Sequence, residues 1–406
     1  MGEKLAIEGG KSVRASPYEV LPIIEEDEIE AVVEVLRSRK LTMLKGNKVK
    51  EFEEAFARYH GVKHAIAVSS GTAALHVALK ALGIGPGDEV IVPPFTFVAT
   101  ATAVLHSNAI PVFADIDPKT YNLDPKSIED RITDRTKAII VVHLFGCPAD
   151  MDPIMKIANE YNLYVVEDCA QAIGAEYRGR KVGTIGDVGC FSFYQSKNMM
   201  TGEGGMIITN DDGIAEKCRL VRHHGEPAWY HYILLGYNYR MTEMQAALGI
   251  VQLKKLERFN EIRRRNAMKY TELLKDIEGL ILPEEPPYGK HVWHLYEVLL
   301  DLGMFKVDRD QFVKAVAAEN VPVGIAYPSV LYLEPLFQRF MGHGKGCPWR
   351  CPLYRGEVKY YKGLCPVAEY VAERCFTLRT DPSMTEDIIE DTVKAIRKVV
   401  NAYKRP

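Results

Sequence analysis

Short apolar runs alternate with amphipathic stretches through the first half of the chain. The runs are rich in valine and isoleucine and predict strands at residues 64–68, 89–92, 110–115, 137–143 and 163–168. The amphipathic stretches repeat their apolar residues every three or four positions and predict helices at 26–40, 46–59, 74–84 and 152–161. Apolar strands that alternate with helices are typical of a parallel sheet covered on both faces. The pattern therefore predicts an α/β fold.

The pattern changes after residue 210, where strands become rarer. A long helical pattern runs from Met244 to about Leu274, and Thr242 is in position to cap its start. Three consecutive arginines, 263–265, are expected to lie on the solvated face of this helix. The proline-rich residues 283–287 then indicate a boundary or linker.

The C-terminal part of the chain predicts a smaller α+β lobe. Its strands are expected at 294–300 and 321–325, and its helices at 308–319 and 385–403. A chain of 406 residues is too long for one simple core, so two lobes are the default. We therefore predict two domains. They are residues 1–275, an N-terminal segment with the large domain, and residues 276–406, a small C-terminal domain with an insert near 343–366.

Composition and charge exclude several classes of function. The chain is 47% hydrophobic and 26% charged, which is ordinary for a globular protein. Its 51 Lys and Arg against 54 Asp and Glu give a net charge of -3, so neither nucleic acid nor an anionic membrane is expected as a partner. No apolar run reaches the roughly 18–20 residues that span a bilayer, and the first residues lack an apolar signal core. These features favour a cytoplasmic protein.

The stretch 188–210 holds one lysine, Lys197, between two apolar runs. A glycine-rich turn, Gly202 to Gly205, follows the lysine. Glycine lets the backbone bend sharply and lets bulky groups approach it closely. Taken alone, Lys197 is most simply a solvated surface charge. Its interpretation depends on the rest of the chain.

Three other features suggest a ligand site. Ser70 to Ala73 join a strand to a helix start, where backbone amides favour phosphate, although plain N-capping explains them equally well. Phe97 follows the next strand and is either a core residue or a platform for a flat ligand. Asp168 ends an apolar strand, at the edge where α/β sheets bind ligands, and either caps the next helix or pairs with a cation.

One small molecule, pyridoxal phosphate (PLP), requires all four groups. It carries a phosphate, a flat ring, a ring nitrogen that takes an acidic partner, and an aldehyde that takes a lysine amine. The order of these groups along the chain is typical of a large two-lobed PLP aminotransferase. A Rossmann dehydrogenase is the competing class, but Ser69 to Ala74 is not a G-x-G-x-x-G run.

Six segments make a family resemblance specific. They read SSGTAALHVAL, GDEVIVPPFTFVAT, FADIDPKTYNLDP, EDCAQAIGA, FSFYQSKNMMTGEGGMIITND and NYRMTEMQAALG. They resemble the DegT/DnrJ/EryC1/StrS aminotransferases, which are PLP-dependent sugar aminotransferases of fold type I. The resemblance covers essentially residues 5–300. It implies a large, mostly parallel-sheet domain sandwiched by helices, plus a smaller α+β C-terminal domain.

The resemblance also implies the catalytic roles. Lys197 forms the Schiff base with the cofactor and moves the proton. Asp168 pairs with the pyridinium nitrogen, and Gln171 lies beside the ring near its 3′ oxygen.

The remaining implied roles concern cofactor binding. Phe97 stacks on the pyridine ring. Asn238 reaches the phosphate of the neighbouring subunit's cofactor, which implies a homodimer with shared active sites. The phosphate is held by Gly71, Thr72, Ala73 and Ser192.

The implied reaction is a ping-pong transfer of an amino group through Lys197. The donor is glutamate or glutamine, pyridoxamine 5′-phosphate is the intermediate, and the acceptor is a nucleotide-linked keto sugar or a cyclitol ketone such as scyllo-inosose. A PLP-binding sensory or regulatory protein and a sugar dehydratase are the alternatives. The family's dehydratases have histidine in place of the lysine, and no fused DNA-binding module is visible, so transamination is favoured.

The chain departs from the family pattern in two segments. Residues 327–332 read YPSVLY where many members have Tyr-Pro-x-Pro-Leu-His, so the acceptor is not carried over. The insert near 343–366 repeats the pair Cys-Pro three times and resembles inserts of cyclitol-type members. We expect it to be a long loop near the mouth of the active site.

The eight cysteines fall into two groups. The cysteines of the insert and one histidine suggest a zinc site, although their spacing is not a standard one and ordinary thiols with no metal are favoured; they are Cys347, Cys351, Cys365 and His343. The others are expected to be reduced core residues; they are Cys147, Cys169, Cys190, Cys218 and Cys375.

Overall fold

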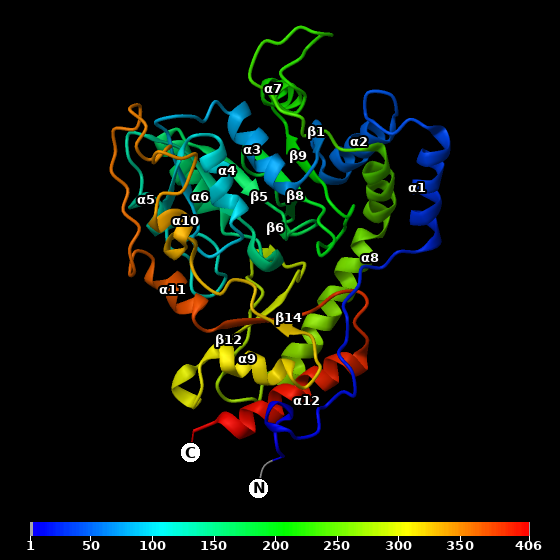
Figure 1. The fold of residues 1–406 in the computed structure, drawn as a ribbon, viewed down its shortest axis with the longest axis vertical. Coiled ribbons are helices and arrows are strands. Elements are labelled where there is room, and N and C mark those ends of the chain that lie inside the picture. Colours follow the sequence, from blue (N-terminus) through cyan, green and yellow to red (C-terminus); the bar gives the residue numbers. More distant parts are fainter. Residues whose placement is uncertain (1–2, 406) are drawn as a thin grey trace.

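The computed structural model describes residues 3–405, and its central element is a seven-stranded sheet of order β1-β9-β8-β5-β4-β2-β3 (Figure 1). Strand β9 runs antiparallel to β1 and β8, whereas the other neighbours are parallel. The sheet is therefore mostly parallel, as predicted; β9 is the exception, because no crossover helix separates β8 from β9 and the chain returns beside β8. The strands are β1 (His64–Val68), β2 (Glu89–Val92), β3 (Ile110–Phe113), β4 (Thr136–Val142), β5 (Tyr164–Asp168), β8 (Val188–Ser192) and β9 (Gly205–Thr209).

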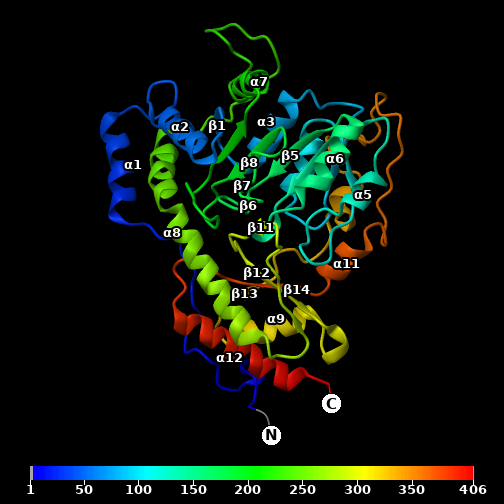
Figure 2. The same cartoon turned by 180° about the vertical axis from the view of Figure 1, so that it is seen from behind.

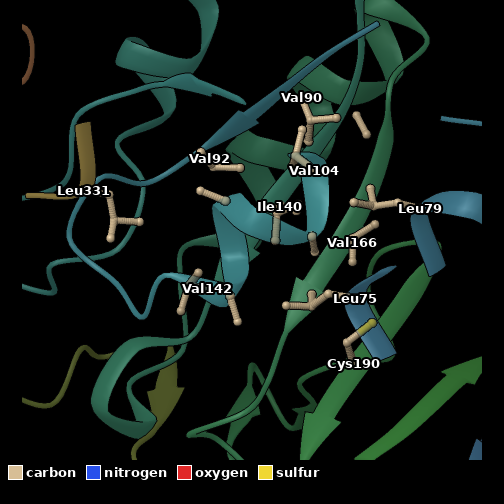
Figure 3. Packing of buried hydrophobic residues seen from close by; sticks show 14 of the residues in the cluster. Leu75, Leu79, Val90, Val92, Val104, Ile140, Val142, Val166, Cys190 and Leu331 are labelled. Atoms are coloured by element: carbon tan, nitrogen blue, oxygen red, sulfur yellow. The ribbon is translucent and has the colours of Figure 1, made fainter. Parts of the chain in front are cut away.

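Helices cover both faces of this sheet, as predicted. Successive residues of a strand face opposite sides, so Ile140 and Val142 pack under α3, α4 and α7, whereas Ile139 and Val141 pack against α2, α6 and α8. Figure 3 shows the first of these layers, in which Leu75 and Leu79 of α3 lie near Val166 and Cys190. The helices of this lobe are α1 (Glu26–Ser38), α2 (Lys48–His60), α3 (Gly71–Ala81), α4 (Ala99–His106), α5 (Pro125–Glu129), α6 (Met151–Tyr161), α7 (Asp212–Arg222) and α8 (Glu243–Leu274).

The second lobe is built on a four-stranded sheet of order β10-β12-β14-β13, in which all paired strands are antiparallel. A small three-stranded sheet of order β11-β6-β7 joins segments from residues 176–181 and 289–290. The strands are β10 (Leu280–Ile281), β12 (Tyr296–Leu300), β13 (Val323–Gly324), β14 (Cys375–Leu378), β6 (Glu176–Tyr177), β7 (Arg180–Lys181) and β11 (Gly289–Lys290). The helices of the second lobe are α9 (Arg309–Ala317), α10 (Pro335–Gln338), α11 (Pro366–Ala372) and α12 (Glu386–Tyr403).

The N-terminal segment packs on the second lobe. The Ala6 and Val13 amides donate to the buried Glu319 carboxylate, which also pairs with Lys398 of α12. Leu5 is fully buried in the core of this lobe. The first described residues therefore lie beside the C-terminal helix α12. The domain boundary at residues 275 and 276 stays a prediction.

Helix α8 connects the two cores. Figure 2 shows it running from beside α1 and α2 down to α12. The Thr242 side chain caps its start in a reciprocal capping box with Gln245, which confirms that prediction. Arg263 is 2% exposed and donates to the Asp381 carboxylate at 3.0 Å, so placing it on the solvated face is wrong. The buried Asp381 carboxylate, which follows β14, explains the difference; of the three arginines, Arg265 is exposed and Arg264 is half-buried.

The Cys-Pro insert covers the β3 edge of the large sheet. The Tyr360 hydroxyl donates to the Pro111 carbonyl at 2.7 Å, and the Tyr354 hydroxyl donates to Glu89 at 2.8 Å. Trp349 is buried behind them and donates to the Tyr360 hydroxyl at 3.1 Å. An open sheet edge is a site of aggregation unless it is covered, and this segment covers it.

Within residues 3–405, no helix is both long and apolar enough to cross a membrane.

We predict that Arg263→Ala lowers the free energy of unfolding by about 3–5 kcal/mol, because it removes one of the two cations that compensate the buried Asp381 carboxylate, the other being Arg379. Urea denaturation, followed by tryptophan fluorescence, measures the loss. Arg265→Ala is the matched control on the exposed face and is expected to change stability by less than about 0.5 kcal/mol. Equal effects of the two substitutions would contradict this account of the helix.

Candidate functional site

A cavity of about 540 Å³ opens at the carboxyl ends of β4, β5 and β8. Val142, Asp168 and Ser192, which end these three strands, all line it. Ligands of open α/β sheets bind at this edge. The small lobe closes the other side with His294, Tyr327 and other residues. The cavity therefore lies where the two lobes meet.

Lys197 lies in the wall of this cavity, in the turn after β8. Its amide donates to the Tyr194 carbonyl at 2.8 Å. The next residue, Asn198, is buried and donates to Asn260 of α8 at 2.8 Å and to the Val292 carbonyl at 3.1 Å. These contacts pin the backbone of Lys197 to the helix that connects the lobes.

The electrostatic surroundings of Lys197 favour a neutral amine. Burial lowers the pKa of the Lys197 amine to about 8; the Asp168 carboxylate opposes this shift, and the Arg379 charge adds to it. A lysine with this pKa is both a nucleophile and a proton carrier near neutral pH.

Asp168 is 6% exposed and presents its carboxylate to the same cavity. Burial raises its pKa, whereas hydrogen bonds from the Ala170 amide and the Thr100 hydroxyl and the charge of Lys197 oppose the shift. The Thr100 hydroxyl lies 2.9 Å from one carboxylate oxygen, and the Ala170 amide lies 3.2 Å from the other. A cationic ring nitrogen placed here would complete the partners of this carboxylate.

The neighbouring acid, Glu167, is held on the opposite side of the strand. It accepts from the amides of Gly183, Ile185 and Gly186 at 2.7 Å each. The Ala149 amide donates to His143 Nδ1 at 3.0 Å, so His143 Nε2 carries the proton that it donates to Glu167 at 3.0 Å. Burial alone would raise the pKa of Glu167, but these hydrogen bonds bring it below its usual range. This saturated network supports the end of β5.

The turn before α3 offers backbone donors to the cavity. Ser70 caps α3 by accepting from the Ala73 amide at 3.1 Å, which confirms the N-capping interpretation; the phosphate interpretation stays a prediction. The amides of Gly71 and Thr72, at the first two positions of the helix, have no intrahelical partner. A Cβ on Gly71 would lie 2.7 Å from Ser192 Cβ, so glycine permits the close approach of α3 and β8. The arrangement suits a phosphate group.

Phe97 and Gln171 complete the predicted set. Phe97 is 61% exposed and lines the cavity, whereas Phe95 is buried in the core. Gln171 accepts from the Phe145 amide at 2.8 Å and donates to the Tyr327 hydroxyl at 2.7 Å. It therefore joins the large lobe to the small one beside the cavity.

Two predicted residues do not line the cavity. The Ala73 side chain is buried, and its amide is taken by the Ser70 cap. Asn238 is exposed on the outer surface, where its backbone forms a bridge with His223. The structure of one chain thus brings together Gly71, Thr72, Phe97, Asp168, Gln171, Ser192 and Lys197.

Sequence analysis gave no role to the residues that the small lobe contributes. Arg379, His294 and Tyr327 line the cavity from segments distant in the chain. Arg379 directly follows β14, so its place at the end of an apolar strand is the sequence feature that could have identified it as a site residue.

The suggested zinc ligands are not gathered into one site. His343 Nε2 lies 2.7 Å from the Leu105 carbonyl, and the buried Cys365 thiol is directed at the Phe113 carbonyl. Among the described residues, clusters of three ligand atoms occur elsewhere, at the His143 network and at three acidic residues around the start of α1. Among the described residues of one chain, the insert contributes nothing to the cavity wall, and its position near the active-site mouth stays a prediction.

Comparison with known proteins shows extensive similarity. Residues 22–397 match the DegT/DnrJ/EryC1/StrS aminotransferase family. The chain is 46% identical to a GDP-perosamine synthase of Caulobacter vibrioides over 74% of this chain and 82% of that protein. It is 37% identical to an L-glutamine:2-deoxy-scyllo-inosose aminotransferase of Streptomyces lividus over 98% of both chains. The crystal structure of S. venezuelae DesV in complex with a ketimine intermediate superposes with a TM-score of 0.83 and 35% identity, covering 92% of this chain and 94% of that one.

Proposed function

Since the chain belongs to the DegT/DnrJ/EryC1/StrS aminotransferase family, we propose that it binds pyridoxal phosphate and moves an amino group from glutamate or glutamine to a keto sugar. The chain is an aminotransferase with the type I fold, whose central sheet and covering helices are described above. One observation carries the assignment of the site. A lysine of low pKa, a buried carboxylate and the open amides of a helix start line one cavity.

The residues present fit this cofactor. The Gly71 and Thr72 amides and the Ser192 hydroxyl would hold the phosphate, because all three residues line the cavity where α3 approaches β8 closely. Asp168 would keep the ring nitrogen protonated, and Phe97 offers an exposed face to the ring. When bound, the cofactor supplies an aldehyde for the amine of Lys197 and a ring that accepts electrons from the reacting carbon.

Lys197 is proposed to act twice in a ping-pong cycle. Its amine would first hold the cofactor and, once displaced by the donor's amino group, would move a proton from the donor's α-carbon to the cofactor's C4′. In the second half-reaction it would move a proton from C4′ to the carbon of the keto sugar that receives the amino group. The lowered pKa places the amine near balance between its two protonation states at about pH 8, as a group that both takes and gives a proton requires.

The acceptor is proposed to be a keto sugar, either nucleotide-linked or of the cyclitol type. Relatives of both kinds support this breadth, namely the perosamine synthase and the scyllo-inosose aminotransferase. The insert that favoured a cyclitol covers a sheet edge, so it does not support one acceptor over the other.

The active unit is proposed to be a homodimer in which Asn238 reaches the partner's cofactor. Asn238 is exposed and follows an aromatic arm, residues 226–235, which projects beyond α7 in Figure 1. In this arm Trp229 is 85% exposed and Tyr230 is 74% exposed. Exposed apolar groups of this kind mark protein interfaces. The cytoplasmic location stays a prediction.

We expect Lys197→Ala to abolish the visible absorbance band of the lysine-bound cofactor and to reduce turnover by at least about a thousandfold, since the nucleophile and the proton carrier are lost together. Spectroscopy and an amino-transfer assay measure the two effects. Lys362→Ala, at an exposed position, is the control and should leave both unchanged. Normal turnover by the Lys197 variant would refute the assignment of this site.

Mixing two inactive variants tests the shared sites. Lys197→Ala and Asn238→Ala are each expected to be inactive or weak as pure dimers. After subunit exchange, half of the dimers are mixed, and each mixed dimer has one intact site, so activity should return to about a quarter of the wild-type value. No recovery despite exchange, verified by mass spectrometry, would argue against a contribution from the partner.

A half-reaction screen tests the acceptor. Enzyme loaded with pyridoxamine phosphate is mixed with nucleotide-linked keto sugars, with free keto sugars and with scyllo-inosose, and the return of the visible band is followed. We expect rapid return with at least one of these ketones. Return with simple 2-oxo acids alone would show that the acceptor is not a sugar.

A further inference from the structure

His294 brings an imidazole ring to the cavity from the start of the small lobe. It lies two residues before β12, is 5% exposed and lines the cavity that holds Lys197. Its amide donates to the Phe145 carbonyl at 2.8 Å, and its carbonyl accepts from Arg263 of α8 at 3.2 Å. The backbone of His294 is therefore held in place where the two lobes meet.

A chain of hydrogen bonds determines which ring nitrogen of His294 carries the proton. The Val292 carbonyl can only accept, so the side-chain atom of Asn198 that lies 3.1 Å from it is the amide nitrogen. The side-chain oxygen of Asn198 then lies 3.1 Å from His294 Nδ1, and this oxygen can only accept. His294 Nδ1 therefore carries the proton, and Nε2 keeps a lone pair.

The Nε2 lone pair is available to a donor in the cavity. Within residues 3–405, no group donates a hydrogen bond to His294 Nε2. Burial and the positive charges of Lys197, Arg263 and Arg379 hold the pKa of His294 well below its usual range, so the ring stays neutral near neutral pH. The influence of the Lys197 charge also shows that the two side chains are close neighbours. His294 thus presents a neutral acceptor beside a group that has only donors.

The Lys197 amine needs a partner of this kind. In the part of the chain that the structure describes, its N–H groups form no hydrogen bond. Under the proposed function, Asp168 is occupied by the ring nitrogen, and Lys197 is released from the cofactor in each half-reaction. A released lysine side chain is long and flexible, so its amine stays in one place only if an acceptor holds it.

We propose that His294 is a positioning residue, whose Nε2 accepts a hydrogen bond from the Lys197 amine whenever the cofactor has released that amine. A neutral acceptor suits this task, because it can hold the amine in both of its protonation states. A carboxylate in the same place would favour the ammonium form and would keep the lysine from acting as a base. This inference rests on the proposed function, in which Lys197 is released and moves a proton.

Two substitutions of His294 separate this role from a merely structural one. In His294→Asn, the amide lies where Nδ1 was and keeps the hydrogen bond to Asn198, but nothing faces Lys197. In His294→Gln, the longer side chain places its amide near the position of Nε2 and offers an oxygen to Lys197. The readout is the pH profile of acetylation of Lys197 by acetic anhydride, which attacks the neutral amine. It is measured by peptide mass spectrometry on protein loaded with pyridoxamine phosphate, in which this lysine is released.

Loss of the acceptor removes a hydrogen bond that stabilises the ammonium form of Lys197. We therefore expect the midpoint of its acetylation profile to fall by about one pH unit in His294→Asn and to stay near the wild-type value in His294→Gln. The other charged groups that act on this amine, Asp168 and Arg379, are unchanged in both variants. His106→Asn, at an exposed histidine of α4, is the control and should match the wild type.

The half-reaction with L-glutamate gives a second readout. Its rate should fall about 10- to 100-fold in His294→Asn, the range for a lost hydrogen bond to a charged group, and should be largely restored in His294→Gln. KM should change little, because His294 acts on Lys197 and not on the donor.

The opposite order, with His294→Asn near the wild type and His294→Gln impaired, would show that His294 only supports Asn198 and would overturn the proposal. The same midpoint in both variants would overturn it as well. A crystal structure of the wild type loaded with pyridoxamine phosphate does not depend on how the variants fold. There we expect His294 Nε2 at about 2.7–3.2 Å from Lys197 Nζ, and a separation beyond about 3.5 Å would contradict the proposal. An absent visible band in wild-type protein mixed with pyridoxal phosphate would instead refute the proposed function.

Discussion

Burial of the Asp168 carboxylate at the end of β5 is the constraint on which the rest of the site depends. A carboxylate removed from water is costly unless nearby donors and cations compensate. Thr100 and the Ala170 amide supply only two hydrogen bonds. Lys197, in the turn after the neighbouring strand β8, adds a positive charge. The adjacent Glu167 differs from it, because three amides and His143 saturate its oxygens. Glu167 and Asp168 are successive residues of β5 and therefore face opposite sides of the sheet. Glu167 is structural, whereas Asp168 faces the cavity and can still bind a ligand.

Helix α8 contacts both lobes and fixes their position relative to each other. Its residue Asn260 holds Asn198, next to Lys197, and its residue Arg263 holds Asp381, next to the turn that carries Arg379. The backbone segments that carry Lys197 and Arg379 are therefore both held by the same helix. Because the site lies between two lobes, such a shared support keeps the distance between its groups constant.

The Cys-Pro insert covers the edge of the large sheet and contributes no residue to the cavity wall of this chain. Its aromatic residues Trp349, Tyr354 and Tyr360 cover the edge strand β3, and the buried Cys365 packs beside Phe113. Covering an edge removes a row of unpaired backbone groups from solvent. A segment that differs strongly from the family pattern thus protects the sheet without reaching the cavity.

The sequence by itself determined the local elements and the identity of the chemical groups. The periods of two and 3.6 residues placed β1, β2, α1, α8 and α12 close to their observed bounds, because each period reflects which face of an element is buried. The order of the phosphate turn, Asp168 and Lys197 likewise pointed to one cavity, since parallel strands end at the same sheet edge.

Only the tertiary structure decided which distant residues meet. Periodicity does not distinguish a buried ion pair from a solvated charge, so Arg263 was placed on the wrong side of α8 and Arg379 received no role. Strand direction was also undecided, because antiparallel β9 has the same apolar character as its parallel neighbours. The insert packs against β3 because this strand forms an edge of the large sheet, and the order of strands in the sheet cannot be read from local sequence pattern. Each of these outcomes is set by contacts between segments far apart in the chain, which local pattern does not encode.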